Sequence, residues 1–125
     1  MSLIEHRPEG LLRVRWVRAD AIGVEGASLT SSFLLTPQTL IADWSPRSVE
    51  QIDDSAIEIV LSLKPELVLL GTGTRQQFPS QAVLAAFLRR QIGFEVMDNA
   101  AAARTYHLLA QEGRKLVVGF LLGGG

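Results

Sequence analysis

A short apolar run at residues 67–70, Leu-Val-Leu-Leu, most constrains what this chain can fold into. The run has no polar alternation, which is typical of a short strand that is covered on both faces. Two glycines, Gly71 and Gly73, follow it and allow a tight exit from the strand. The run therefore predicts a buried strand around which the rest of the chain is organised.

The first third of the chain alternates between apolar and polar residues, as antiparallel strands with one buried face do. Trp16, Phe33 and Trp44 lie on these strands, where they could belong to the core or to an exposed patch for a protein partner, and we favour the core. Residues 1–10 are expected to form a flexible or edge-lying start. The pattern predicts strands over 12–19, 22–26, 28–35 and 39–44.

After Arg47 the apolar residues recur at helical spacing. The predicted helices run from Val49 to Leu63, from Ser80 to about residue 90, and from Asp98 or Asn99 to about Glu112. Pro65 ends the first helix, and Gly93 is expected to permit the turn after the second. Residues 94–97 and 115–122 are short apolar stretches that predict two further strands, and a glycine tail follows them.

This order of elements predicts an α/β fold that borders on α+β. We expect a three-layer β/α domain in which N-terminal antiparallel strands pack beside a mixed sheet with about three helices. The 125-residue length suits a single domain over residues 1–125, with an ordered core at about 11–122.

Charge and composition exclude several classes of protein. The chain has a formal net charge of -1 and no cysteine, so disulfides and cysteine-based chemistry are ruled out. Arg13, Arg15 and Arg18 are the nearest approach to a basic cluster, and we interpret them as a solvated strand edge. We expect no nucleic-acid partner and no membrane insertion, and a cytoplasmic location, because no signal-peptide or spanning segment is evident.

The loop after the buried strand is the first candidate site. Gln76 stands where a dinucleotide fingerprint needs its third glycine, and the Lys of a phosphate-binding P-loop is also missing. Backbone amides and an arginine could still hold a small anion, although we favour a simple strand exit. If the strands before the loop and before Asp98 are parallel neighbours, both segments border one pocket. The ligand-binding hypothesis comprises Gly71, Thr72, Gly73, Thr74, Arg75, Asp98 and Arg104.

A catalytic set is not evident from the spacing of the polar residues. Arg104 and His107 are neighbours on one helix, while Asp98 lies about two turns away, so the three do not form a triad by spacing. An enzymatic hypothesis requires all three to converge with the glycine loop. We name no catalytic residue, metal site or cofactor, and we rank enzyme activity third.

Several motifs occur together in a recognisable order. They are Gly71-Thr72-Gly73 with Arg75, Gln77, Phe78 and Pro79, then residues 92–98, Ile-Gly-Phe-Glu-Val-Met-Asp, and residues 100–106, Ala-Ala-Ala-Ala-Arg-Thr-Tyr. Together they resemble the domain of unknown function four-nine-eight family, the prokaryotic relatives of mitochondrial complex I assembly factor three. The resemblance covers about residues 12–122.

The resemblance implies a compact three-layer β/α domain with no established catalytic residues or cofactor. It also implies a protein partner, since the mitochondrial relatives act in respiratory complex assembly. At 103 and 107 this chain has Ala and His, where family members often have Cys and Asn. We therefore expect a non-enzymatic interaction or assembly-factor-like domain, with anion or ligand binding as the alternative; the partner and the oligomeric state stay open.

Overall fold

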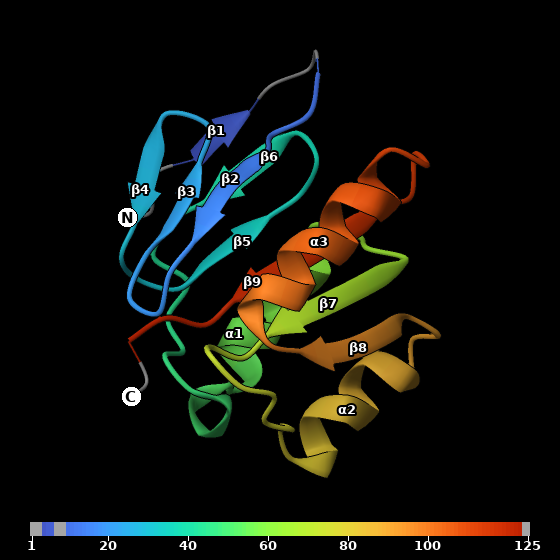
Figure 1. The fold of residues 1–125 in the computed structure, drawn as a ribbon. Coiled ribbons are helices and arrows are strands. Elements are labelled where there is room, and N and C mark those ends of the chain that lie inside the picture. Colours follow the sequence, from blue (N-terminus) through green and yellow to red (C-terminus); the bar gives the residue numbers. More distant parts are fainter. Residues whose placement is uncertain (1–3, 7–9, 124–125) are drawn as a thin grey trace.

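The computed structural model describes residues 4–6 and 10–123 (Figure 1). The strands are β1 Ile4–His6, β2 Val14–Val17, β3 Ile22–Val24, β4 Ala27–Leu29, β5 Phe33–Leu35, β6 Thr39–Ile41, β7 Leu67–Gly71, β8 Gly93–Met97 and β9 Leu116–Phe120. The helices are the 3-10 helix η1 Val49–Gln51 and the α-helices α1 Asp54–Ser62, α2 Gln81–Leu88 and α3 Asn99–Ala110.

These elements form three layers. The central layer is a mixed sheet with the strand order β1-β6-β5-β9-β7-β8. On one face it is covered by α3, which lies beside the antiparallel sheet β2-β3-β4, and on the other face by α1 and α2 (Figure 1). The α/β fold with antiparallel N-terminal strands beside a mixed sheet is therefore confirmed.

β7 has the environment that its apolar sequence predicts. All five of its residues are buried, and it pairs in parallel with β8 on one side and β9 on the other. Leu69 belongs to the core on the α3 face, while Val68 and Leu70 belong to the core on the α1 and α2 face. A strand with apolar contacts on both faces has no place for alternating polar side chains.

The prediction of one strand over 28–35 is wrong, because β4 and β5 belong to different sheets. The chain changes sheets at Ser32, whose buried hydroxyl accepts a hydrogen bond from Leu122 N at 2.9 Å. The predicted strand over 39–44 is also shorter, since Asp43 adopts a left-handed conformation with φ of 62°.

A short strand lies near the N-terminal end of the chain, within the expected flexible or edge-lying start. β1 pairs antiparallel with β6, so the sheet begins before the expected core of 11–122. Residues 1–3 and 7–9 of the expected flexible start, and 124–125 of the glycine tail, lie outside the described residues.

The helix expected from Val49 begins later. A single 3-10 turn comes first, and α1 starts after Asp53, whose carboxylate accepts a hydrogen bond from Ala56 N at 2.9 Å. Ile52 is extended and separates the two segments. An aspartate with extended backbone is a strong N-cap, so it starts a new helix instead of continuing the old one.

The other helix boundaries show which caps the sequence identified correctly. Ser80 and Asp98 are the N-caps of α2 and α3, as predicted. Gly93 does not form the turn after α2, because Gln91 takes the left-handed conformation with φ of 59° and Gly93 begins β8. Phe33 and Trp44 are core residues as expected, whereas Trp16 is only partly buried and carries Arg18 over its ring at 4.6 Å.

Candidate functional site

The loop after β7 lies beside the start of α3, where the sequence places a shared pocket rim. Thr72 N donates a hydrogen bond to Met97 O at 2.9 Å, and Asn99 N donates to Gly73 O at 2.8 Å. Both bonds join the carboxyl ends of the parallel strands β7 and β8. Ligands of open α/β sheets commonly bind at this edge.

Asn99 fixes the loop to two neighbouring segments, a role that the sequence reasoning missed. Its side chain is 3% exposed; Oδ1 accepts from Gly73 N at 3.2 Å, and Nδ2 donates to Leu121 O at 3.0 Å. A Cβ at Gly71 would collide with Asn99 Oδ1, so glycine is required there by close approach. The sequence did contain a signal for this role. Asp98 already caps α3, so the side chain of the adjacent Asn99 is free to bond to another segment.

Thr72 closes the loop from inside. Its buried hydroxyl donates to Arg75 O at 2.7 Å and accepts from Gln77 N at 3.0 Å. The amides of Thr72 and Gly73 are thus used by the protein itself, while Thr74 and Arg75 are exposed. The loop has a defined shape, and fewer of its amides are available to an anion than the glycines alone indicate.

A cavity of about 690 Å³ opens beside this loop. Two arginines, Arg47 and Arg75, line it, and within the part of the chain that the structure describes neither guanidinium has an ion-pair partner. Asp20 and Glu50 line it as well, so the cavity carries both signs of charge. The segments that contribute to its wall are 19–20, Thr30, 47–50, 72–75, Gln77 and 121–123.

Asp98 and Arg104, which the sequence also included in the candidate site, do not line the cavity. Asp98 uses its carboxylate to accept a hydrogen bond from Ala101 N at 2.8 Å, which caps α3. Arg104 is exposed on α3, and neither residue is among those that line the cavity. The structure therefore brings the glycine loop and Arg75 together with Arg47, which the sequence did not indicate. Asp98 lies beside the loop, between Met97 and Asn99, but it does not line the cavity, and neither does Arg104.

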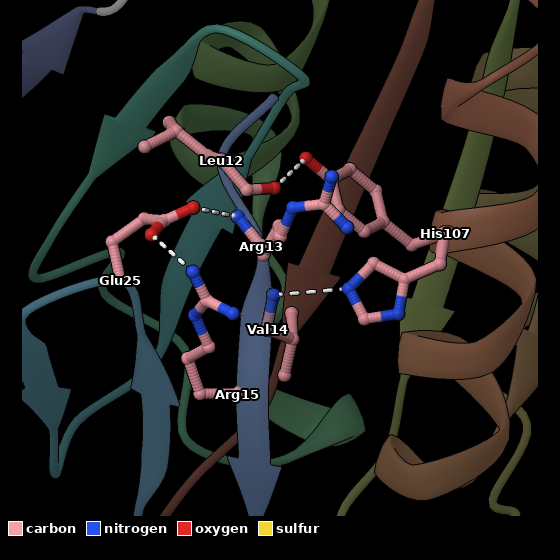
Figure 2. Close-up of polar contacts among 7 residues, drawn as sticks. Leu12, Arg13, Val14, Arg15, Glu25 and His107 are labelled. Atoms are coloured by element: carbon pink, nitrogen blue, oxygen red, sulfur yellow. Dashed lines mark hydrogen bonds and ion pairs between the residues drawn. The ribbon is translucent and has the colours of Figure 1, made fainter. Parts of the chain in front are cut away.

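His107 contacts the three-stranded sheet instead of the loop. Figure 2 shows its Nε2 accepting a hydrogen bond from Val14 N, at 3.1 Å. Burial, and then the positive charges of Arg13 and Arg15, lower the pKa of His107. The neutral ring, with its proton on Nδ1, is the form that can accept this bond.

Tyr106, next to it on α3, is fully buried and joins the same layers. Its hydroxyl donates to Leu12 O at 2.6 Å and lies 3.2 Å from Thr36 O. Burial, and secondarily the negative charge of Glu25, raise the pKa of Tyr106. Tyr106 and His107 together anchor α3 to the start of β2.

Arg13 and Arg15 form the expected solvated edge at the start of β2. Arg13 N donates to one oxygen of the Glu25 carboxylate at 2.8 Å, and Arg15 Nη2 donates to the other at 3.1 Å (Figure 2). Both arginine side chains are exposed. The contacts link β2 to the turn after β3.

Comparison with known proteins gives one family match and several relatives. The model of the family described as "Protein of unknown function (DUF498/DUF598)" matches residues 14–121. A rat protein, NADH dehydrogenase (ubiquinone) 1 alpha subcomplex assembly factor 3, is 31% identical over 116 residues, which are 91% of this chain. The chain spans 62% of the length of that relative.

Solved structures resemble the fold along nearly its full length. The Xanthomonas campestris protein XCC1710 is 44% identical, with a TM-score of 0.85 over 94% of this chain and 89% of its own. A Bordetella parapertussis protein is 31% identical, with a TM-score of 0.83 over 93% of this chain and 99% of its own. In the described part of this chain, no helix is both long and apolar enough to cross a membrane.

Proposed function

Because this chain belongs to the DUF498/DUF598 family of proteins of unknown function, we propose that it is a non-enzymatic domain that binds a protein partner, in the manner of an assembly factor. The rat relative carries assembly factor in its name and aligns with 91% of this chain. The name describes the relative, and it does not identify the partner of this chain.

The proposal rests on the observation that polar side chains of α3 and its N-cap bind the protein's own backbone. Asp98, Asn99, Tyr106 and His107 each hydrogen-bond to backbone groups of the fold. General acid-base catalysis needs a group within hydrogen-bond reach of a substrate. Side chains that already hold the layers together support a binding role over a chemical one.

Affinity capture tests the proposal. The tagged chain is immobilised and incubated with native lysate at concentrations that retain weak complexes, with the tag alone as the control. We expect specific enrichment of at least one protein, which is then purified and titrated against the chain. Recovery of no specific partner under these conditions contradicts the proposal.

Anion binding in the 690 Å³ cavity is the second candidate function, and the two arginines of the cavity favour it. Guanidinium groups bind carboxylates and phosphates with paired hydrogen bonds. The loop contributes the exposed Thr74 and Arg75, held in place by Thr72 and Asn99. We propose a small phosphate or carboxylate compound as the ligand.

Titration with inorganic phosphate and with citrate tests the second candidate. Arg75→Ala and Arg47→Ala are each expected to weaken binding about tenfold, the effect of one charged hydrogen bond. Arg104→Ala is the matched control, since it removes an exposed arginine that does not line the cavity. Equal affinity in the wild type and in all three variants contradicts this function.

A further inference from the structure

β8 is an edge strand of the central sheet and pairs only with β7 within the described part of the chain. It is five residues long, and its register with β7 has no bulge. Natural edge strands are commonly protected by prolines, bulges or very short length. β8 has none of these three protections, and its edge is limited by the charged Glu95 and by Gln76 of the loop after β7.

The backbone groups of β8 divide between the inner and the outer side. Gly93 N donates to Glu66 O, and Met97 O accepts from Thr72 N, so residues 93, 95 and 97 point toward β7. In a parallel ladder the alternate residues point the other way. The amide and carbonyl groups of Phe94 and Val96 therefore face outward, and all but the Val96 carbonyl can pair with another strand.

α2 forms an apolar wall above this edge. Its Phe87 ring stacks on Phe94 at 4.8 Å, so the helix packs directly on β8. Leu84 and Leu88, one turn apart, share a flank, and Leu88 is 75% exposed. A right-handed crossover, the usual geometry of a strand-helix-strand unit, turns this flank away from α1 and toward the outer side of β8.

The opposite face of the edge carries a negative charge. Glu95 and Met97 pair with Leu69 and Gly71, so their side chains lie on the α3 face of the sheet. Glu95 is exposed and has no ion-pair partner among residues 4–6 and 10–123. An added strand would thus meet leucines on one face and a carboxylate on the other.

We propose that β8 binds an extended segment of the protein partner as an additional strand. Edge strands that lie beside a helix recognise peptides in this way, with backbone hydrogen bonds for affinity and alternate side chains for specificity. The segment has apolar residues that contact Leu84 and Leu88, and a lysine or arginine opposite Glu95. This inference rests on the proposed interaction function and assigns its surface.

A second copy of the chain fits this edge less well than a basic segment does. Antiparallel pairing of two β8 strands about Glu95, the register with the greatest overlap, would set the two Glu95 side chains opposite each other. Like charges in directly opposed positions destabilise a strand pair. Charge complementarity therefore favours a heterologous partner with a cationic residue.

Gln76 occupies part of the edge in the free protein. Its Nε2 donates to Val96 O at 2.8 Å, which supplies the bond that a partner strand would make there. A bound segment either ends before Val96 O or displaces this side chain. Removal of the side chain by Gln76→Ala frees the carbonyl and is expected to strengthen binding of an added strand.

A designed peptide tests the edge directly. The probe is acetyl-Thr-Val-Lys-Val-Thr-Val-amide, which places valines on one face and lysine on the other; it is titrated into the whole 15N-labelled chain. We expect chemical-shift changes and slower hydrogen exchange at the amides of Phe94 and Val96. The control peptide has N-methylated backbone nitrogens, which removes strand pairing while it keeps the side chains.

Variants distinguish binding at the β8 edge from non-specific hydrophobic binding. Leu88→Asp is expected to weaken peptide binding about tenfold, and Glu95→Lys about threefold. Leu108→Asp is the matched control, because Leu108 is 63% exposed on α3, on the other side of the sheet. It should leave the affinity unchanged within about twofold.

Three results would overturn the assignment: no change at the β8 amides with millimolar peptide, equal binding of the N-methylated peptide, or β8 shifts that depend on protein concentration alone, which would assign the edge to a second copy.

The affinity capture separates this inference from the proposed function. A partner recovered equally by the wild type, Leu88→Asp and Leu108→Asp leaves the interaction function in place and removes β8 as its surface. A partner lost only with Leu88→Asp supports both.

Discussion

The two faces of the central sheet are held in different ways. On the α3 face, buried or half-buried polar side chains cross between layers, as Tyr106 does to Leu12 O and His107 to Val14 N. On the α1 and α2 face the contacts are almost all apolar, and Trp44 Nε1, which donates to Ala56 O at 3.1 Å, is the principal polar link. Both faces are therefore held by apolar packing, and the α3 face is positioned by directional bonds as well.

The difference shows which elements are fixed in one position relative to the central sheet. Apolar contacts are non-directional and tolerate small shifts, whereas a hydrogen bond to one carbonyl does not. The three-stranded sheet joins α3 through such bonds, and Asn99 fixes the candidate loop in the same way. Substitutions on the two faces should consequently differ in kind as well as in size.

The largest expected effect is at Tyr106. Tyr106→Ala removes a fully buried ring and its bond to Leu12 O, and it should cost about 4 kcal/mol of unfolding free energy. Tyr106→Phe keeps the ring and should cost about 1–2 kcal/mol, because the carbonyl loses its partner. Urea unfolding measures both. Equal costs would show that the hydroxyl carries the whole effect, against the expected dominance of packing.

Asn99→Ala should have the next largest effect, about 2–3 kcal/mol, since it leaves Gly73 N and Leu121 O without their partner. Hydrogen exchange should become faster at the Gly73 amide in particular. Asp98→Ala, which removes only the helix cap, should cost about 1 kcal/mol and serves as the adjacent comparison. A smaller loss for Asn99→Ala than for Asp98→Ala would contradict the role of Asn99 as the loop anchor.

Gly119→Ala examines the apolar face. An added Cβ would lie 2.8 Å from Trp44 Cζ3, so the indole must move and the variant should lose about 1–2 kcal/mol. Near-ultraviolet circular dichroism and thermal unfolding report the change. Gly26→Ala is the control, because a Cβ there meets no atom within 4 Å. Unaltered stability in Gly119→Ala would mean that this face repacks more freely than its burial indicates.

The smallest effect is the pH dependence from His107. Burial and the two arginines lower its pKa in the folded state, while the unfolded chain has the ordinary pKa of about 6.5. The stability from this residue is therefore complete above that pH and is lost as the pH falls through the folded-state pKa. His107→Gln, which retains an acceptor and does not titrate, should flatten this part of the profile. If His107→Gln has the same stability profile against pH as the wild type, the pH dependence comes from another group.

Much of the fold could be predicted because its signals are local. Ser80 and Asp98 cap helices that start within three residues, and Pro65 ends α1 through its own ring. Short apolar runs identified β7 and β8 in the same local way. The strand over 28–35 was predicted wrongly because a distant bond, from Leu122 N to the Ser32 hydroxyl, accompanies the change of sheet. The helix start at Val49 was predicted wrongly because Asp53 caps a new helix.

The candidate site was harder to predict, since it is assembled from segments far apart in the sequence. The glycine loop and its place beside α3 followed from parallel strand order. Arg47 could not be identified, because only the folded chain brings it to the cavity that Arg75 also lines. Asp98 was included because it follows the neighbouring strand, and Arg104 because its guanidinium could contact an anion; neither lines that cavity.

The sequence by itself determined most of the helices and strands, the buried character of β7 and the family resemblance, because each depends on neighbouring residues or on motif order. Only the tertiary structure decided that Asn99 anchors the glycine loop, that His107 accepts a bond from β2, and that β8 ends the sheet with open backbone groups. Hydrogen-bond partners 22–94 residues apart join these parts, as in the contacts of Asn99 and Tyr106. Their pairing depends on the geometry of the packed layers, which local sequence does not encode.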